Sequence, residues 1–370
     1  MESANIVIIG AGVIGLAIAA RLSSDNDDIY VLEKNQGVGL ETSTHNSGVI
    51  HSGIHYPPGS LKARLCVTGN KMIYEICEKN GIPSKKLGKL TVATNEYEIA
   101  SLKKLYENGR TNGVSGMKFL ERSEIKNMEE NVDAEMALYT PTSGIVEQDY
   151  LIRYFYSESV RNGANISTGT IVTGITHTGS GYELTGTSVG HSFRIKSRTV
   201  INSAGLYSDR IAALAGLDIN ALGYKLHYYK GDYYRVVGKA PVKMLVYPVP
   251  EDPGLGIHLT PDMSGSVKLG PNAYPVTDIN YTEGSRAEDF KNDVMRFLPK
   301  IKDGRIEYDS SGIRPKLSGK NGEFRDFIIH HESDHGLNNF IDLIGIESPG
   351  FTASPAIARY VEEIYKREVS

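Results

Sequence analysis

The chain has 370 residues, of which 40 are Lys or Arg and 44 are Asp or Glu, so its formal net charge is -4. This balance excludes a chain-wide basic surface for nucleic acid, and 40% hydrophobic against 23% charged residues exclude a disordered chain. The length is too great for one small core and predicts two domains.

The two cysteines, Cys66 and Cys77, form neither a metal-ligand spacing nor a disulfide scaffold. We therefore expect a reducing compartment, two buried and inert thiols, and no metal site.

The first residues predict no targeting segment. The uncharged run from Ile6 to Ala20 contains three glycines, and no Lys or Arg precedes it. Both features argue against a signal peptide and a membrane-spanning helix. Because the predicted first strand begins almost at Met1, we expect a cytoplasmic location, with peripheral membrane contact left open.

A strand, a glycine-rich turn and a helix open the chain. Residues 6–9 form a continuous β-branched run, which is typical of a parallel strand buried on both faces. The run leads into Gly10-Ala11-Gly12-Val13-Ile14-Gly15, and a helix is predicted to about Ser23. A second strand over residues 29–33 ends on Glu33 and completes a βαβ unit.

This placement makes the glycine motif a strong indication of a dinucleotide site. Gly10 permits the tight turn, Gly12 lets a pyrophosphate approach the helix N-terminus, and Gly15 allows close packing of helix and strand. Glu33 is placed to accept hydrogen bonds from an adenosine ribose. The alternative is a tight turn without a ligand, and these residues do not decide which dinucleotide binds.

Later segments favour a flavin over a nicotinamide. A polar, Gly-rich loop follows Glu33 from Asn35 to about Ser60, where a further helix and strand would otherwise be expected. Residues 199–205 form another buried strand that enters a helix at Ser208. Near the C-terminus, residues 339–345 predict a strand and residues 353–366 a closing helix. The nucleotide domain is therefore assembled from separated segments.

The intervening segments are rich in tyrosine and predict a second, mainly antiparallel sheet that carries the substrate face. The predicted strands are residues 89–94, 224–237, 243–249 and 266–269, and the predicted helices are residues 96–108 and 286–297. Most of the 22 tyrosines are expected to pack within this sheet.

Several strings, in one order along nearly the whole chain, resemble a known family. They are HNSGVIHSGIHY at 45–56, PGSLKARLC at 58–66, YKGDYY at 229–234, YPVP at 247–250, GIHLT at 256–260, LGPNA at 269–273, GIRP at 312–315 and IESPG at 346–350. With them the chain resembles the FAD-dependent oxidoreductases of the D-amino-acid-oxidase superfamily, and within it the L-2-hydroxyglutarate dehydrogenase/oxidase branch.

The resemblance implies an α/β fold with an α+β second domain, in which a split Rossmann-like FAD-binding domain carries a mainly antiparallel substrate sheet. It predicts an FAD-binding domain over residues 1–85, 146–222 and 312–370, and a substrate domain over residues 86–145 and 223–311. The implied activity is oxidation of a small 2-hydroxy acid, foremost L-2-hydroxyglutarate to 2-oxoglutarate, by noncovalently bound FAD. Electrons would pass to oxygen, a quinone or another carrier.

Other activities stay open at this point. The branch usually has a Tyr-Tyr pair where this chain has His55-Tyr56, which leaves the shape of the pocket rim undecided. Glycerol-3-phosphate oxidases and dehydrogenases share the flavin half and the Val-Ile-His string. Amine oxidases that act on glycine or sarcosine, and a non-catalytic flavoprotein subunit, are the remaining alternatives.

Oxidation of a secondary alcohol needs a base for the hydroxyl proton, and imidazole, with an ordinary pKa of about 6.5, suits that role at neutral pH. His51 is the predicted base, and its alternatives are a structural or an FAD-positioning role. His55 is a weaker candidate, expected at the pocket rim, and His258 is the first other candidate if His51 is not the base. Arg314 is predicted to bind the substrate carboxylate with its planar fork. Lys230 and His258 are candidates for a distal carboxylate or for polarising the hydroxyl, and Tyr234 and Tyr247 follow from the resemblance alone.

The helix N-terminus at Gly350 is expected to face N1 and O2 of the flavin, where its dipole stabilises negative charge. Its alternative is an ordinary helix after a Pro-Gly turn. Residues 202–205 are expected to close over the pyrophosphate. The full set of predicted FAD-binding residues is Gly10, Gly12, Ile14, Gly15, Glu33, Lys34, Thr44, Asn46, Ser47, Gly48, Val49, Val172, Ala204, Gly205, Gly350, Phe351 and Thr352.

Overall fold

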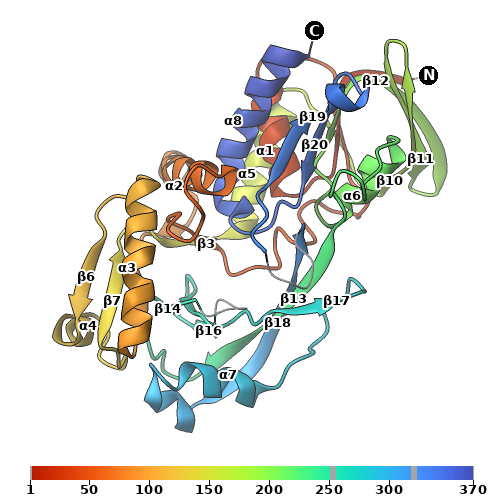
Figure 1. The fold of residues 1–370 in the computed structure, drawn as a ribbon. Coiled ribbons are helices and arrows are strands. Elements are labelled where there is room, and N and C mark those ends of the chain that lie inside the picture. The colour runs from red at the N-terminus through yellow and green to blue at the C-terminus, as the bar shows by residue number, and fades with distance from the viewer. Residues whose placement is uncertain (1, 251–255, 318–322, 370) are drawn as a thin grey trace. The chain divides into compact units, whose positions relative to one another are not determined.

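A computed structural model describes residues 2–250, 256–317 and 323–369 of the protein (Figure 1). The chain divides into two compact units. Unit 1 comprises Met1–Thr44, Gln148–His227 and Arg314–Ser370, and unit 2 comprises His45–Glu147 and Tyr228–Ile313. Each unit is therefore built from segments that are far apart in the sequence.

Unit 1 contains an eight-stranded mixed sheet. Four parallel pairings, β9 with β2, β2 with β1, β1 with β12, and β12 with β20, form its centre, and β10, β11 and β19 add antiparallel pairings. The β-branched run Ile6, Val7 and Ile8 is completely buried in β1, as expected for a central parallel strand. The strands are β1 (Glu2–Ile9), β2 (Ile29–Leu32), β9 (Asn165–Ser167), β10 (Thr170–Thr178), β11 (Gly181–Ser188), β12 (His191–Asn202), β19 (Ile328–His331) and β20 (Phe340–Ile344).

Helices pack closely within unit 1. Helix α1 contacts both α5 and α8, and the Arg21 Nε to Glu362 Oε2 ion pair at 2.7 Å links α1 to α8. Since seven of the ten residues of α1 are buried, this helix lies in the interior of the unit. The helices are α1 (Val13–Leu22), α5 (Gln148–Arg161), α6 (Ser208–Leu214) and α8 (Gly350–Glu368), with 3-10 turns η1 (Gly205–Tyr207) and η3 (Glu332–His335).

Unit 2 contains a nine-stranded sheet in the order β17-β13-β16-β15-β14-β5-β7-β6, with β18 paired to β13, and a small sheet β3-β8-β4. The large sheet is mainly antiparallel, but β5 and β14 run parallel. Its strands are β5 (Lys89–Ala93), β6 (Lys118–Glu121), β7 (Met136–Thr140), β13 (His227–Val237), β14 (Leu245–Pro248), β15 (Leu259–Pro261), β16 (Val267–Leu269), β17 (Tyr274–Val276) and β18 (Arg305–Lys316). The small sheet has β3 (Val49–Ile50), β4 (Ser84–Lys85) and β8 (Gly144–Val146).

One hydrophobic core of unit 2 joins the large sheet to a short helix. Leu90, Val246 and Leu259 of the sheet cluster with Phe290 and Val294 of α7, and all five side chains are at most 1% exposed. The helices of this unit are α2 (Leu61–Asn80), α3 (Glu96–Thr111), α4 (Arg122–Met128) and α7 (Ala287–Val294), with the 3-10 turn η2 (Pro299–Asp303).

The predicted fold class is confirmed: a parallel-centred nucleotide sheet from split segments accompanies a mainly antiparallel second sheet. The division into units differs from the predicted boundaries chiefly at the first one. Residues 45–85, which the sequence assigned to the FAD-binding domain, belong to unit 2, because β3 pairs with β8 of that unit.

Candidate active site

The glycine turn of unit 1 has the geometry that a dinucleotide site requires. Gly10 adopts a φ of +101°, and a Cβ there would lie 2.6 Å from the Ser203 carbonyl oxygen. A Cβ on Gly15 would lie only 1.9 Å from the Gly10 carbonyl oxygen. Both positions therefore require glycine, one for its backbone conformation and one for close packing. Ser203 braces the turn, since its hydroxyl donates to the Ile9 and Gly10 carbonyl oxygens at 3.0 and 3.2 Å.

Glu33 is 7% exposed and holds the turn from the end of β2. Its carboxylate accepts the Ala11 N–H on Oε2 and the Asn35 N–H on Oε1, each at 2.8 Å. Each carboxylate oxygen can accept a second hydrogen bond, so these contacts leave acceptor capacity for a ribose hydroxyl. The residue predicted to meet the ribose is thus fixed in place by backbone donors.

Two helix N-termini of unit 1 begin at glycine-containing turns. The N-cap of α1 is Gly12, and the Val13 N–H donates to the Ser43 hydroxyl at 2.9 Å. Helix α8 begins at Gly350, three residues earlier than the sequence predicted, and its N-cap Pro349 supplies no side-chain cap. Helix N-termini with few side-chain caps suit the anionic groups of a flavin dinucleotide. The residues present therefore fit FAD.

The other predicted FAD-binding residues fall in both units. Lys34 forms a 2.5 Å ion pair with Glu41 and lies over the Tyr207 ring, so its ammonium already has a partner. Thr44 donates from Oγ1 to the Gly39 carbonyl oxygen at 2.9 Å. Ile14, Val172, Ala204, Gly205, Phe351 and Thr352 also belong to unit 1, whereas Asn46, Ser47, Gly48 and Val49 belong to unit 2.

His51 directly follows β3 in unit 2 and is held through its backbone. Asn70 of α2, which is 5% exposed, donates from Nδ2 to the His51 carbonyl oxygen at 2.9 Å. The Cys66 thiol, also on α2, lies 3.6 Å from the same oxygen. Both cysteines are buried and free, as expected, and burial raises the pKa of the Cys66 thiol strongly. Helix α2 therefore sets the position of the predicted base.

Asn108 of α3 and Asn112, the residue that caps the C-terminus of this helix, fix the residues after His51. Asn108 Nδ2 donates to the carbonyl oxygens of Ile54 and Tyr56 at 2.5 and 2.9 Å. Asn112 Nδ2 donates to those of Gly53 and Tyr56 at 2.9 and 2.8 Å. The loop over residues 51–56 is therefore held from α2 at its start and from α3 along its length.

A group of basic side chains surrounds this loop in unit 2. Lys89 Nζ lies 3.1 Å from His55 Nε2 and 4.9 Å from the centroid of the Tyr247 ring. The Tyr247 ring stacks on His258 with centroids 3.6 Å apart and an interplanar angle of 6°. Two of the predicted substrate residues, His258 and Tyr247, are thus brought together.

Burial shifts the protonation of this basic group. Desolvation lowers the pKa of the Lys89 ammonium to about 7. Desolvation and then the charges of Lys89, His51 and His258 hold the pKa of His55 well below its ordinary value. Perturbed groups gathered in one place are typical of a functional site.

Lys230 and Tyr234 are engaged elsewhere in unit 2. The Lys230 ammonium, 3% exposed as a residue, donates to Asn280 Oδ1 at 3.0 Å and to the Thr282 carbonyl oxygen. The Tyr234 hydroxyl donates to Glu283 Oε1 at 2.5 Å, and its ring packs on Phe290 in the core. Both side chains have structural roles here, which argues against the substrate contacts that the sequence predicted for them.

Arg314 lies near the end of β18, at the point where the chain passes from unit 2 to unit 1, and is half-buried. Its guanidinium has no ion pair or side-chain hydrogen bond within the described residues. A half-buried guanidinium without an acidic partner suits an incoming carboxylate.

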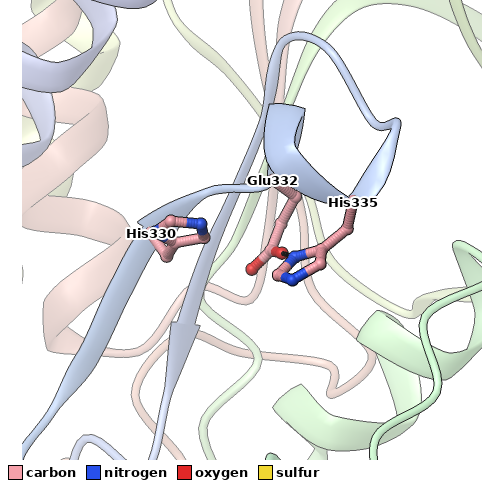
Figure 2. A group of neighbouring side chains, drawn as sticks. All are labelled: His330, Glu332 and His335. Carbon is pink, nitrogen blue, oxygen red and sulfur yellow. Dashed lines mark hydrogen bonds and ion pairs between the residues drawn. The ribbon is translucent and has the colours of Figure 1, made fainter. Parts of the chain in front are cut away.

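A second cluster of side chains lies in unit 1, where His330, Glu332 and His335 have potential metal ligands within 4.8 Å of one another (Figure 2). The Glu332 side chain is fully buried, and each of its oxygens has a partner. The Tyr224 hydroxyl donates to Oε1 at 2.9 Å, and His335 Nδ1 lies 2.5 Å from Oε2. These contacts account for Glu332 and His335, and we assign no metal to the cluster.

Lys89 is the site residue that the sequence analysis missed. It was assigned to a predicted strand without a role. The available signal was a lysine that opens the otherwise uncharged run Leu90-Thr91-Val92-Ala93, a pattern in which a charged side chain is either at a strand end or functional.

Comparison with known proteins agrees with this geometry. The family model described as FAD dependent oxidoreductase matches residues 5–364. Among curated relatives, the mitochondrial L-2-hydroxyglutarate dehydrogenase of Arabidopsis thaliana is 36% identical, covering 99% of this chain and 84% of that protein. The enzyme of the same name from Homo sapiens is 32% identical, covering 99% and 89%.

Solved structures give the same fold. The dithionite-reduced L-alpha-glycerophosphate oxidase of Mycoplasma pneumoniae, with FAD bound, has a TM-score of 0.88 at 28% identity, covering 100% of this chain and 96% of that one. Glycine oxidase of Geobacillus kaustophilus has a TM-score of 0.81 at 21% identity, covering 100% and 96%, and supports the fold alone.

These relatives also correct one expectation. The predicted cytoplasmic location is contradicted, because the curated relatives are named mitochondrial. The prediction rested on the lack of a targeting segment in the sequence, and such an absence does not determine a location. In the described part of the chain, no helix combines the length and the apolar character needed to cross a membrane.

The split nucleotide unit, the glycine turn braced by Glu33 and Ser203, and a family match over residues 5–364 lead to one conclusion. The chain belongs to the FAD-dependent oxidoreductases, and it is an enzyme of that family.

Proposed function

We propose that the protein oxidises L-2-hydroxyglutarate to 2-oxoglutarate. The observation that carries this proposal is the similarity, over 99% of the chain, to enzymes named L-2-hydroxyglutarate dehydrogenase. The residues support it, since a hydroxy acid needs a base for its hydroxyl and a cation for its carboxylate. His51 and Arg314 supply these two groups.

FAD, held by unit 1, would supply the acceptor for the hydride from C2. His51 takes the hydroxyl proton on its neutral imidazole, in a loop that Asn70, Asn108 and Asn112 hold in place. Arg314 binds the C1 carboxylate through two parallel N–H donors and thereby orients the C2 hydrogen. Loss of the proton and the hydride together leaves the 2-oxo acid.

Within unit 1, the chain's own residues position the cofactor. Glu33 would accept from the ribose, and the first turns of α1 and α8 would face the pyrophosphate and the N1–O2 side of the flavin. We propose noncovalent binding. The relatives are named dehydrogenases, so we propose a carrier such as a quinone, in place of oxygen, as the final electron acceptor.

One alternative has support from a solved structure. The L-alpha-glycerophosphate oxidase of Mycoplasma pneumoniae is 28% identical to this chain, and a phosphate could replace the carboxylate at Arg314. The curated relatives favour the hydroxy acid over this alternative.

Steady-state turnover tests the choice. We expect kcat/KM for L-2-hydroxyglutarate to exceed the values for L-alpha-glycerophosphate and glycine by at least about 100-fold, which corresponds to about 2.7 kcal/mol. A quinone analogue should support faster turnover than oxygen alone. A higher kcat/KM with L-alpha-glycerophosphate would establish the alternative.

A further inference from the structure

Lys89 is the first residue of β5, a strand in which all five residues are buried. Lys89 itself is 1% exposed, and it pairs with Leu245 of β14 on one side and Thr140 of β7 on the other. A buried ammonium is unfavourable unless an anion or hydrogen-bond acceptors meet it. Considering residues 2–250, 256–317 and 323–369, no carboxylate forms an ion pair with Lys89.

The Lys89 ammonium contacts an imidazole and an aromatic ring. His55 Nε2 lies 3.1 Å from Nζ, and the face of the Tyr247 ring lies 4.9 Å away. Cys66 of α2 is also near, but its thiol stays protonated because burial raises its pKa. The positive charge of Lys89 is therefore solvated by the protein but not neutralised.

This contact fixes the tautomer of His55. When Lys89 is charged it can only donate hydrogen bonds, so the Nε2 atom of a neutral His55 then accepts and the ring proton lies on Nδ1. Nδ1 is inaccessible to solvent and has no hydrogen-bond partner among the residues that the structure describes. A buried N–H without an acceptor is rare in folded proteins, which points to an acceptor supplied by a ligand.

The surroundings of His55 favour an anionic ligand. The basic side chains of Lys89, His51 and His258 all act on the His55 ring, and each can donate a hydrogen bond to an anion, the lysine from its ammonium and a histidine from its ring N–H. The Tyr247 ring stacks on His258 and lies against the Lys89 ammonium, so the three side chains form one group. A carboxylate would both accept the Nδ1–H bond and neutralise the charge of Lys89 behind it.

We propose that His55 Nδ1–H, backed by the Lys89 ammonium, binds the C5 carboxylate of a 2-hydroxy dicarboxylate substrate. The inference rests on the proposed function, in which Arg314 binds the C1 carboxylate and leaves the C5 carboxylate to be met. Lys230, one of the two residues predicted for a distal carboxylate, already donates to Asn280 and Thr282. His55 thus becomes a residue that selects dicarboxylates.

The test compares two substrates that differ only at C5. L-2-Hydroxyglutarate has a carboxylate there, and L-2-hydroxypentanoate has a methyl group. In the wild-type holoenzyme we expect the dicarboxylate to be preferred. Lys89→Met should lower the ratio of the two kcat/KM values about 10- to 100-fold, the effect of one charge-assisted hydrogen bond, mainly by raising KM for the dicarboxylate.

A pair of His55 variants separates the two ring nitrogens. His55→Gln places its amide near the position of Nε2, so this variant retains the Lys89 contact but has no donor at Nδ1. We expect it to lose the preference for the dicarboxylate. His55→Asn places an amide N–H near the position of Nδ1, so this variant should retain most of the preference for the dicarboxylate. Lys85→Met removes the charge of an exposed lysine of unit 2 that donates to Met263, and should leave the ratio unchanged.

Binding of glutarate supplies a readout without turnover. We expect glutarate, followed by its perturbation of the flavin absorbance, to bind wild-type holoenzyme more tightly than pentanoate, and to lose this advantage in Lys89→Met and His55→Gln. Equal losses of kcat/KM for both substrates, or unchanged glutarate affinity in both variants, would overturn the inference. If wild-type enzyme does not oxidise L-2-hydroxyglutarate but glutarate affinity still depends on Lys89 and His55, the proposed function fails and the anion site stands.

Discussion

His51 is fixed at the residue level by what its backbone accepts. Its carbonyl oxygen takes the Asn70 amide at 2.9 Å and lies near the Cys66 sulfur, both on α2. Removing the ring should therefore leave the loop in place. We expect His51→Ala to retain FAD and to slow single-turnover flavin reduction on the order of 10² to 10⁴-fold, the usual effect of losing a general base. Stopped-flow absorbance measures it, with His191→Ala, an exposed histidine of β12, as the control.

The pH profile gives the second half of this prediction. Only neutral imidazole accepts a proton, so wild-type reduction should slow towards acidic pH, and this acidic limb should be absent in His51→Ala. A His51→Ala enzyme that keeps both the wild-type rate and the limb would assign the base to another group, with His258 as the first candidate.

Arg314 is predicted to recognise a carboxylate by shape as well as by charge. Lysine keeps the charge but loses the planar fork, so Arg314→Lys should lower kcat/KM for L-2-hydroxyglutarate by about 10- to 100-fold, or about 1.5 to 3 kcal/mol. FAD content, measured by absorbance after release, should not change. Wild-type kcat/KM for every hydroxy acid would remove Arg314 from the site.

At the scale of elements, α3 acts as a support for the loop over residues 51–56. Asn108 satisfies two carbonyl oxygens of that loop, so Asn108→Ala leaves both without this donor. We expect a loss of about 1 to 3 kcal/mol in the free energy of unfolding, together with a lower kcat. Denaturant unfolding and steady-state kinetics measure the two effects. Asn80→Ala, which removes an exposed bond to Ile76, is the matched control and should change neither. A stable Asn108→Ala enzyme with full kcat would contradict the supporting role.

A buried carboxyl pair lies where β20 meets η3. Burial and then the neighbouring Glu332 charge raise the pKa of Asp342 well above its usual range. Asp342 accepts the Asn202 amide on Oδ1 at 2.6 Å, while its buried Oδ2 has no donor in the described chain. A proton on Oδ2 that donates to Glu332 accounts for this geometry. His330 pairs with Asp342 across the strands, and Tyr224 and His335 contact Glu332.

This pair makes stability depend on pH. The unfolded chain releases the Asp342 proton above a pKa of about 3.9, whereas the folded protein keeps it, so this group lowers stability as the pH rises. Asp342→Asn keeps a donor towards Glu332 but has no proton to release. We expect the Tm of the variant, relative to wild type, to increase between about pH 5 and pH 8. A Tm difference that does not change with pH would contradict a protonated Asp342.

Local patterns predicted the elements whose burial is uniform. The β-branched run of β1, the βα turn and the strand that became β20 follow from residue types alone. Helix α2 was not predicted. Its buried face includes Lys62, Gly69 and Asn70 beside apolar residues, so its 20 residues show no continuous apolar stripe. The β10–β11 hairpin was likewise not assigned, since its strands are half exposed and owe their position to pairing with β12.

At the scale of the whole molecule, the nucleotide unit was predictable because each of its three segments has its own signal. The side chains that gather in unit 2 were harder to predict. The proposal for His51 comes from its sequence string, whereas the contact between His55 and Lys89 joins residues 34 positions apart and depends on the sheet that places β5 beside β14. Lys230 and Tyr234 were predicted from the same kind of string, and only their partners in space indicate structural roles.

The most direct test of the account is anaerobic titration of the purified holoenzyme. The protein should be yellow with noncovalent FAD, and L-2-hydroxyglutarate should bleach it with one 2-oxoglutarate formed per flavin reduced. The D-enantiomer should leave the colour unchanged, since in the proposed mechanism Arg314 and His51 would determine which face of C2 is presented. A colourless protein after reconstitution with FAD, or a flavin that L-alpha-glycerophosphate reduces and L-2-hydroxyglutarate does not, would contradict the account.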